Sequence, residues 1–125
     1  MEALGSAHIV VFVTAASAEE GRAIGHALVE ERLAACVNII PSIESIYRWQ
    51  GQVHHGQESL LIAKTTAAAL EQLGQRVKEL HSYDTPEIIA VPIVAGAQDY
   101  LLWIDEETRS SGSSAQRIEV RTDSQ

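Results

Sequence analysis

The side chains of this chain that best suit a soft metal ion are its one cysteine, Cys36, and its five histidines. Copper prefers thiolate and imidazole ligands, so Cys36 is the first candidate for metal binding. The same residue lies between Ala35 and Val37 at an expected helix-to-strand junction, where a free cysteine can equally be a small buried hydrophobe. Because there is no second cysteine at metal-binding spacing, the sequence predicts no structural zinc site within one chain.

Three of the five histidines fall in expected turns. His54 and His55 are adjacent, and neighbouring side chains of an extended segment point to opposite faces, so one metal ion could hardly take both from one chain. We interpret them as part of a solvated turn. His81 lies with Tyr83 in a turn-rich connection, 81–87 (HSYDTPE), at the end of an expected helix, where it could cap the last carbonyls.

The sequence shows no catalytic constellation. It has no dinucleotide-binding fingerprint, no phosphate-loop pattern and no G-x-S-x-G nucleophile elbow. No serine or cysteine lies in a recognisable nucleophile–base context. The sequence therefore predicts a protein that is not an enzyme.

Periodicity and caps place the elements that must position these residues. Strands are expected at 8–14, 36–53, 59–65 and 88–94, with a hairpin turn at 54–56 and an edge position for the last strand because of Pro92. Helices are expected at 17–34 from the capping box Ser17-Ala18-Glu19-Glu20, at about 66–80 after Thr65 or Thr66, and at 99–109 after Gln98 or Asp99. The order βαββαβ plus a helix predicts a ferredoxin-like α+β fold, an antiparallel sheet with two helices on one face. Its other face would be bare in a monomer.

The segment 36–53 is too long for a compact domain. Fully extended it would span roughly 60 Å, against a radius of gyration of about 13–14 Å for a domain of this size. We therefore expect a bend near Pro41 or a strand that projects from the domain. Alternation from Ile43 gives it an aromatic face with Tyr47 and Trp49. A projecting aromatic strand favours pairing with another subunit, so an oligomer is predicted.

Composition limits the class of protein. The 125 residues suffice for one domain, predicted at 1–109, followed by a disordered tail at 110–125 that begins SSGSS. The net charge of −8 argues against a nucleic-acid partner, which needs a basic face. No signal peptide or membrane helix is expected, and a single cysteine fits a reducing cytoplasm.

Several long motifs, in one order, resemble the CutA divalent-cation-tolerance family over about residues 8–109. They are the segments 33–38 (LAACVN), 45–51 (SIYRWQG), Glu58 before a hydrophobic strand, 62–65 (IAKT), 77–81 (VKELH), Tyr83 with Pro86-Glu87, and 99–104 (DYLLWI). The resemblance implies a homotrimer of ferredoxin-like subunits interlocked by long strands, similar to the PII-like signalling proteins. It also implies heat-tolerant assembly, a link to divalent metal tolerance and no established catalytic reaction.

The chain departs from the family in two places. The turn Thr14-Ala15-Ala16 lacks the proline that usually follows the first strand. Some members carry a thiol and paired histidines that are proposed as copper ligands; the matching residues here are Val13, Leu80 and His81. His81 alone retains a ligand, so Cys36 and His81 are the metal candidates that this sequence offers.

The resemblance also suggests a cleft between subunits, lined by Trp49, Lys64, Tyr83 and His81. The aromatic residues could instead serve interface packing, and Lys64 could pair with Glu58 or another acid. Our preferred hypothesis is a cytoplasmic, non-enzymatic homotrimer in divalent metal tolerance that binds copper or another divalent cation. The alternatives are a PII-like sensor of a small molecule or anion in that cleft, and a trimeric interaction scaffold.

Overall fold

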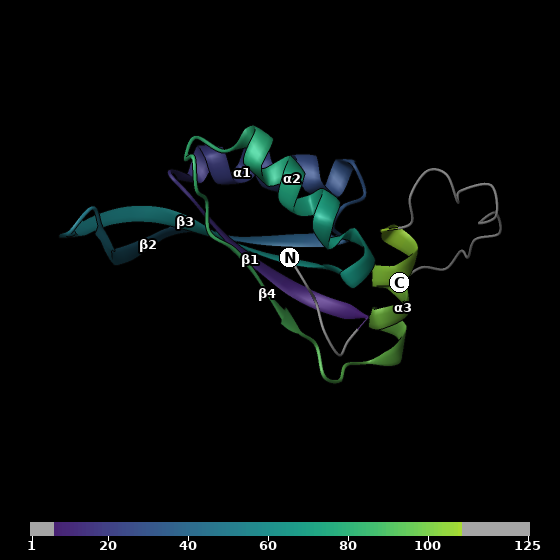
Figure 1. Cartoon of the computed structure of the whole chain (residues 1–125). Helices are drawn as coiled ribbons and strands as arrows, with labels where there is room; N and C mark the ends of the chain where they lie inside the picture. Colours follow the sequence, from purple (N-terminus) through teal and green to yellow (C-terminus); the bar gives the residue numbers. More distant parts are fainter. Residues whose placement is uncertain (1–6, 109–125) are drawn as a thin grey trace.

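Four antiparallel strands and three α-helices form the part of the chain that this computed structural model describes, residues 7–108 (Figure 1). In chain order the elements are β1 (His8–Ala15), α1 (Ala18–Glu30), β2 (Cys36–Trp49), β3 (Gln52–Thr66), the 3-10 helix η1 (Ala67–Ala69), α2 (Leu70–Leu80), β4 (Ile88–Pro92) and α3 (Gln98–Glu107). The sheet order is β2-β3-β1-β4, and α1 and α2 cover one face. This confirms the ferredoxin-like α+β prediction with an extra C-terminal helix.

The core lies between the sheet and the two helices. Along β1, Ile9, Val11 and Val13 are fully buried toward the helices, while Val10 and Phe12, which alternate with them, lie half-buried on the opposite face. The helices contribute buried apolar stripes, namely Ile24 and Leu28 from α1 and Leu70, Leu73 and Val77 from α2.

Helix α1 begins as predicted but ends earlier. The Ser17 Oγ accepts the Glu20 N–H at 3.0 Å, while the Glu20 carboxylate accepts the Ala16 N–H at 2.9 Å rather than reaching back to Ser17. The helix was expected to reach residue 34 and stops at Glu30. Arg32 takes a φ of 63° and the Leu33 N–H donates to Leu28 at 2.8 Å, the pattern of a Schellman motif formed without glycine.

The hairpin turn lies at Gln50-Gly51, so the turn predicted at 54–56 is wrong. Gln50 and Gly51 take φ values of 52° and 79° between the paired residues Trp49 and Gln52, as a two-residue type I′ turn requires. Residues 54–56 lie instead inside β3, which runs unbroken from the turn. The prediction failed because Gly56 and two polar neighbours resemble a turn, although nothing at Gly56 requires positive φ.

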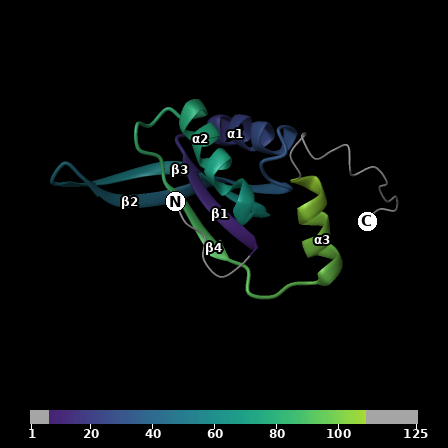
Figure 2. The same ribbon diagram turned by 45° about the vertical axis from the view of Figure 1, so that its right-hand side comes forward.

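The hairpin of β2 and β3 projects beyond the helices, and β2 is bulged at its base (Figure 2). The pairing shifts between Ile40 and Ile43, so that Pro41 and Ser42 lie opposite Ser59 alone. An extra residue bends the bulged strand and increases its twist. The irregularity predicted near Pro41 is therefore present, and the strand also projects.

The remaining elements follow the prediction with small differences. The strand expected at 88–94 is β4, which ends at Pro92 and lies at the edge of the sheet. Neither Thr66 before η1 nor a residue at the start of α3, where Ala97 is the N-cap, makes a side-chain cap. The predicted tail, 110–125, lies outside the described residues. None of the helices within residues 7–108 is long and apolar enough to cross a membrane.

The turn assignment predicts opposite effects of alanine at two glycines of the hairpin. Gly51→Ala places a side chain at φ 79° and should lower the free energy of unfolding by roughly 1–2 kcal/mol. Gly56→Ala, in a strand with nothing within 4 Å of the new Cβ, should leave it unchanged or raise it by up to about 1 kcal/mol. Denaturant unfolding measures both, and equal effects would contradict the turn at Gln50-Gly51.

Candidate functional site

Polar side chains from three parts of the fold meet where the hairpin leaves the body of the domain. Tyr83 and His81 come from the connection 81–87, Glu20 from the first turn of α1, and Glu58 from β3. The Tyr83 hydroxyl donates to Glu58 at 2.9 Å, and the ring centroids of His81 and Tyr83 are 4.7 Å apart. We call these four residues the connection cluster. At the base of the hairpin it presents the exposed side chain of Tyr83 beside partly buried carboxylates.

His81 is the structural centre of the connection cluster. Its side chain is fully buried, and its Nε2 lies 2.7 Å from the carbonyl oxygen of Thr14, so Nε2 carries a proton and donates. Its Nδ1 accepts the Tyr83 N–H at 3.0 Å. His81 therefore bonds the end of β1 rather than the last carbonyls of α2, and the capping interpretation is wrong. A metal ion could reach either nitrogen only by displacing one of these hydrogen bonds.

Glu20 joins α1 to the connection. Its carboxylate accepts the Ser82 N–H at 2.6 Å and the Ser82 hydroxyl at 3.1 Å, in addition to the Ala16 N–H. Partial burial alone would raise the pKa of Glu20, but these hydrogen bonds to the charged form outweigh burial and hold the pKa below the ordinary 4.5. The ionised carboxylate thus fixes the position of the connection.

Tyr83 is the member of the connection cluster whose titration is most strongly changed. Burial and the hydrogen bond to Glu58, reinforced by that negative charge, raise the pKa of Tyr83 to about 12. Tyr47 lies close enough to contribute, and its ring stacks on His54 at a centroid distance of 5.5 Å. The phenol is therefore a persistent hydrogen-bond donor at neutral pH.

The two predicted metal ligands are not brought together in one chain. Cys36 pairs with Lys64 across β2 and β3, whereas the carbonyl that holds His81 belongs to Thr14, which is opposite Leu60. Four residues along β3, from Leu60 to Lys64, separate these points by about 13 Å. Among residues 7–108, no three histidine, cysteine, aspartate or glutamate side chains are grouped to hold a metal ion.

The Cys36 thiol is half-buried and free, and it lies beneath α3. Burial and the neighbouring thiol, which is a hydrogen-bond partner of the phenol, raise the pKa of Tyr100. Tyr100 in turn packs on Trp103 with ring centroids 5.4 Å apart. That Cys36 binds a metal ion, or that it serves as a small buried hydrophobe, stays a prediction in each case.

The residues predicted to line a cleft are also dispersed within one chain. Trp49 is at the hairpin tip opposite Gln52, half-exposed, while Lys64 lies twelve residues further along β3, about 40 Å away. Lys64 donates to the Asn38 side chain rather than to Glu58, which binds Tyr83 instead. A cleft that contained Trp49, Lys64 and Tyr83 would thus need a second copy of the chain.

Sequence reasoning named His81 and Tyr83 of the connection cluster but missed the roles of Glu20 and Glu58 in it. Ser17-x-x-Glu20 marked Glu20 as a capping residue, but its contact with Ser82 spans 62 positions. Glu58 was recognised before a hydrophobic strand, and nothing in the local sequence indicates that Tyr83 will reach it. No local signal could have supplied these pairs, because each depends on how α1, β3 and the connection pack.

Both the sequence and the fold of this chain match known proteins. Residues 9–107 match the family model described as "CutA1 divalent ion tolerance protein". A "Divalent-cation tolerance protein CutA" of Thermus thermophilus is 57% identical over 99 residues, which cover 79% of this chain and 96% of that protein. "Protein CutA, chloroplastic" of Arabidopsis thaliana is 48% identical over 102 residues, 82% of this chain but 56% of that longer protein. A solved Thermus thermophilus structure, "Divalent cation tolerance protein (Cut A1)", superposes with a TM-score of 0.80 at 55% identity and covers 82% of this chain and 99% of that one.

The lowered pKa of Glu20 predicts a loss of stability in acid. A carboxylate whose folded pKa is below 4.5 stabilises the fold above that pH, and the contribution is lost as the pH falls through the folded pKa. Glu20→Gln should lower the free energy of unfolding at pH 7 by about 1–2 kcal/mol and flatten the acid side of the stability curve. Glu19→Gln, at the adjacent exposed position, is the matched control. Denaturant unfolding from pH 7 to pH 3 measures both, and identical acid limbs in wild type and Glu20→Gln would refute this account.

The raised pKa of Tyr83 predicts a late step in an alkaline titration. One of the three tyrosines should ionise with a midpoint at about 12, seen in the ultraviolet absorbance of phenolate. The associated stability is present below pH 10.0 and is lost as the pH rises toward 12. Tyr83→Phe should remove this step, Glu58→Gln should lower its midpoint, and Tyr47→Phe should retain it. A step near 12 that survives Tyr83→Phe would show that another phenol is responsible.

Proposed function

Because this chain belongs to the CutA1 divalent ion tolerance family, we propose that it protects the cell against excess divalent metal ions, copper among them, as a cytoplasmic homotrimer that acts by binding rather than by catalysis. The observation that carries the proposal is the match over residues 9–107, supported by a divalent-cation tolerance protein that is 57% identical over nearly its whole length. The homotrimer in this proposal comes from the resemblance to the family.

Two features of the fold support assembly from several copies. The hairpin projects with large exposed apolar side chains, Ile46, Tyr47, Trp49 and Val53. The sheet face opposite α1 and α2 exposes Ile89 and Val91 on the edge strand β4. Exposed apolar patches of this kind mark interfaces in soluble proteins. A second copy is the simplest partner that covers both.

In this proposal a copper ion would bind between copies of the chain. Cys36 and His81 lie too far apart in one chain to share an ion, and both His81 nitrogens already have partners. A copper site would therefore take the Cys36 thiol of one copy together with ligands from a neighbouring copy. Its affinity would then depend on the trimer as well as on the ligands.

Two measurements test the proposal: the metal tolerance of cells and the mass of the assembled protein. Deleting the gene should raise sensitivity to Cu²⁺, and expression of this chain should restore growth. Native mass spectrometry of tag-free protein should show three chains, with copper taken up in multiples of three and lost in Cys36→Ser. His26→Ala, which alters an exposed histidine on α1, is the control.

Two results would contradict the proposal. Unchanged metal sensitivity after deletion would remove the tolerance role, whatever the oligomeric state. A trimer that ignores copper and the Cys36 substitution would remove copper binding by this residue while leaving a tolerance role by another route to be tested with zinc and other divalent ions.

A further inference from the structure

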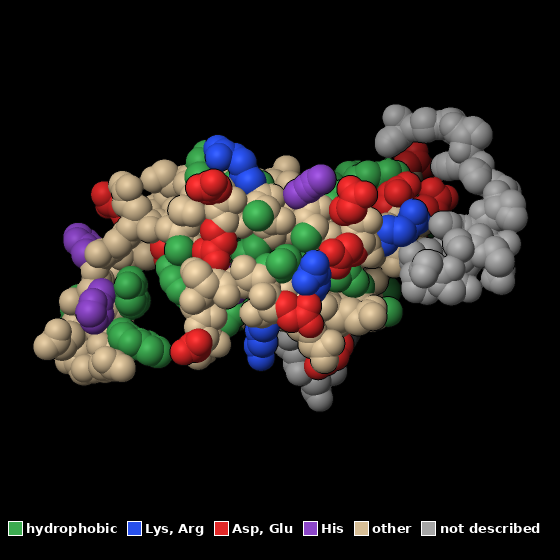
Figure 3. All heavy atoms as spheres, turned by 90° about the horizontal axis from the view of Figure 1, so that it is seen from above, with side chains coloured by type: hydrophobic (Ala, Val, Ile, Leu, Met, Phe, Trp, Pro, Cys, Tyr) green, Lys and Arg blue, Asp and Glu red, His purple; other side chains and the backbone are tan. Residues whose placement is uncertain are grey.

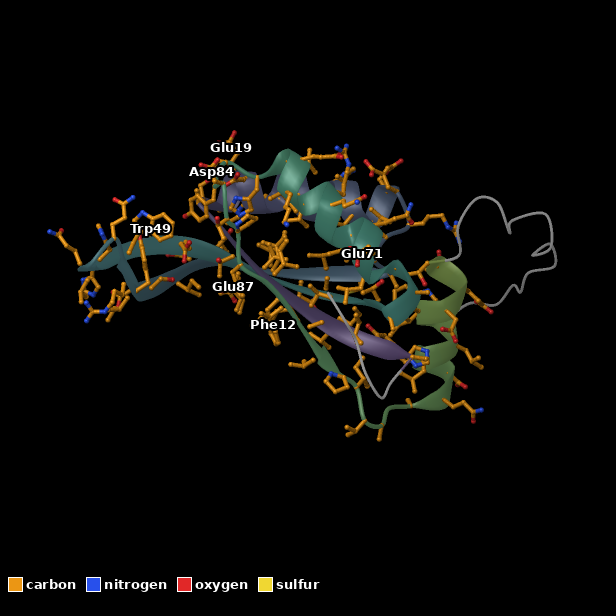
Figure 4. All side chains as sticks on the ribbon, viewed as in Figure 1. Phe12, Glu19, Trp49, Glu71, Asp84 and Glu87 are labelled. Atoms are coloured by element: carbon orange, nitrogen blue, oxygen red, sulfur yellow. The ribbon has the colours of Figure 1, made fainter. Side chains whose placement is uncertain are left out.

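The sheet face that lies opposite α1 and α2 combines apolar side chains with two charges at opposite corners. We call it the open face and define it by the residues that alternate with the core: Val10, Phe12, Asn38, Ile40, Leu60, Ile62, Lys64, Ile89 and Val91. Glu87, one residue before β4, continues the parity of Ile89 and Val91. Figure 4 shows Phe12 and Glu87 on the side of the sheet that faces away from the helices. Glu19 and Glu71 lie on the helix side.

Lys64 is the cation of the open face. It sits on β3 between Cys36 and Val10 in one row across the sheet. Its ammonium donates to the neutral side chain of Asn38, and it makes no ion pair with a carboxylate of residues 7–108. An ammonium buried without an anion is strongly unfavourable, so any partner that covers this face has to supply negative charge near Lys64.

Glu87 is the anion at the other corner. Ile88 pairs with Val13, so Glu87, one residue earlier, lies level with Thr14 across the sheet. Lys64 lies level with Val10 and Val91. The two charges are thus about 13 Å apart along the strands and about 10 Å apart across them, too far to pair within one chain. Glu87 is exposed and forms no ion pair with other residues of the range 7–108.

The helix side offers no comparable pattern. Seen from that side in Figure 3, acidic and basic side chains are interspersed over the surface. On it Arg76 already pairs with Glu31 at 2.9 Å and with Glu79 at 3.0 Å. On the open face, Lys64 and Glu87 make no ion pair within residues 7–108, and apolar side chains lie between them. Glu58 has the same alternation on β3 as Lys64 and accepts the Tyr83 hydroxyl. A surface of this kind is complementary to a second copy of itself.

We infer that, when open faces pack together, Lys64 of one copy forms an ion pair with Glu87 of the next copy. The inference rests on the proposed homotrimer and adds the contact that sets its register. The apolar side chains supply the attraction, whereas the charge pair favours the alignment that places Glu87 of one copy beside Lys64 of another. The same contact repeats at each interface of a closed ring, since every copy presents both charges.

Charge reversal and rescue test the inference. Lys64→Glu and Glu87→Lys should each place like charges at every interface and weaken assembly at least about tenfold. The double variant Lys64→Glu/Glu87→Lys restores opposite charges and should recover most of the loss. Oligomer mass by size exclusion with light scattering, over a dilution series and a guanidinium series, measures assembly. Lys78→Glu on α2 and Glu19→Lys on α1 are reversals on the helix side and should leave it unchanged.

Neutral variants guard against a reversal that merely prevents folding. Lys64→Met and Glu87→Gln should each weaken assembly, and the double neutral variant should lose less than the sum of the two. Circular dichroism confirms that each variant is folded. Additive losses, or a double reversal no better than the single ones, would overturn the pairing. If Lys64 variants alone weaken assembly, its counterion is another group and the inference fails.

The outcomes separate this inference from the proposed function. A wild-type protein that is monomeric at all concentrations would refute the proposed trimer and, with it, the pair. A wild-type trimer indifferent to both charge reversals would refute the pair alone. Metal tolerance is measured independently of either result.

Discussion

The structure depends on the close seating of α1 on β3 at the base of the hairpin. The buried Ser59 hydroxyl donates to the Ser17 carbonyl at 2.8 Å, and Gly21 lies so close that a Cβ there would be 2.5 Å from the Ser59 oxygen. Ser59 is also the residue that faces the β2 bulge. One small polar side chain therefore holds the helix layer against the sheet at the position where the hairpin changes direction.

The connection cluster extends this contact toward the hairpin. Glu20, one turn into α1, binds Ser82, and this places His81 against the end of β1 and Tyr83 against Glu58 on β3. Hydrogen bonds to the ionised form of Glu20 lower its pKa, whereas burial and the hydrogen bond to Glu58 raise the pKa of Tyr83. His81 is thus a structural centre, and Tyr83 is the exposed residue beside it, with partly buried Glu20 and Glu58.

The surface away from the helices has the opposite character. On the helix layer Arg76 pairs with two glutamates, whereas the open face and the hairpin expose large apolar side chains. This asymmetry follows from the ferredoxin-like topology, in which α1 and α2 cover one sheet face. On the other face, α3 lies over Cys36 at one end. The predicted metal ligands Cys36 and His81 are dispersed within one chain.

The sequence by itself determined the element order, the two-layer fold and the residues of the connection, because strand alternation, helical stripes and the Ser17 cap are local patterns. It did not determine the hairpin turn, which the tertiary structure places at Gln50-Gly51, because the register of β2 on β3 selects the turn and no local pattern specifies that register. It did not show that Arg32 ends α1, since the reversal lacks the glycine that usually marks it. Nor could it show what His81 and Glu20 bind, because Thr14 is 67 positions from His81 and Ser82 is 62 from Glu20. Contacts between residues so far apart along the chain are fixed only when the sheet and helices pack, so the tertiary structure alone decided the chemistry of the site.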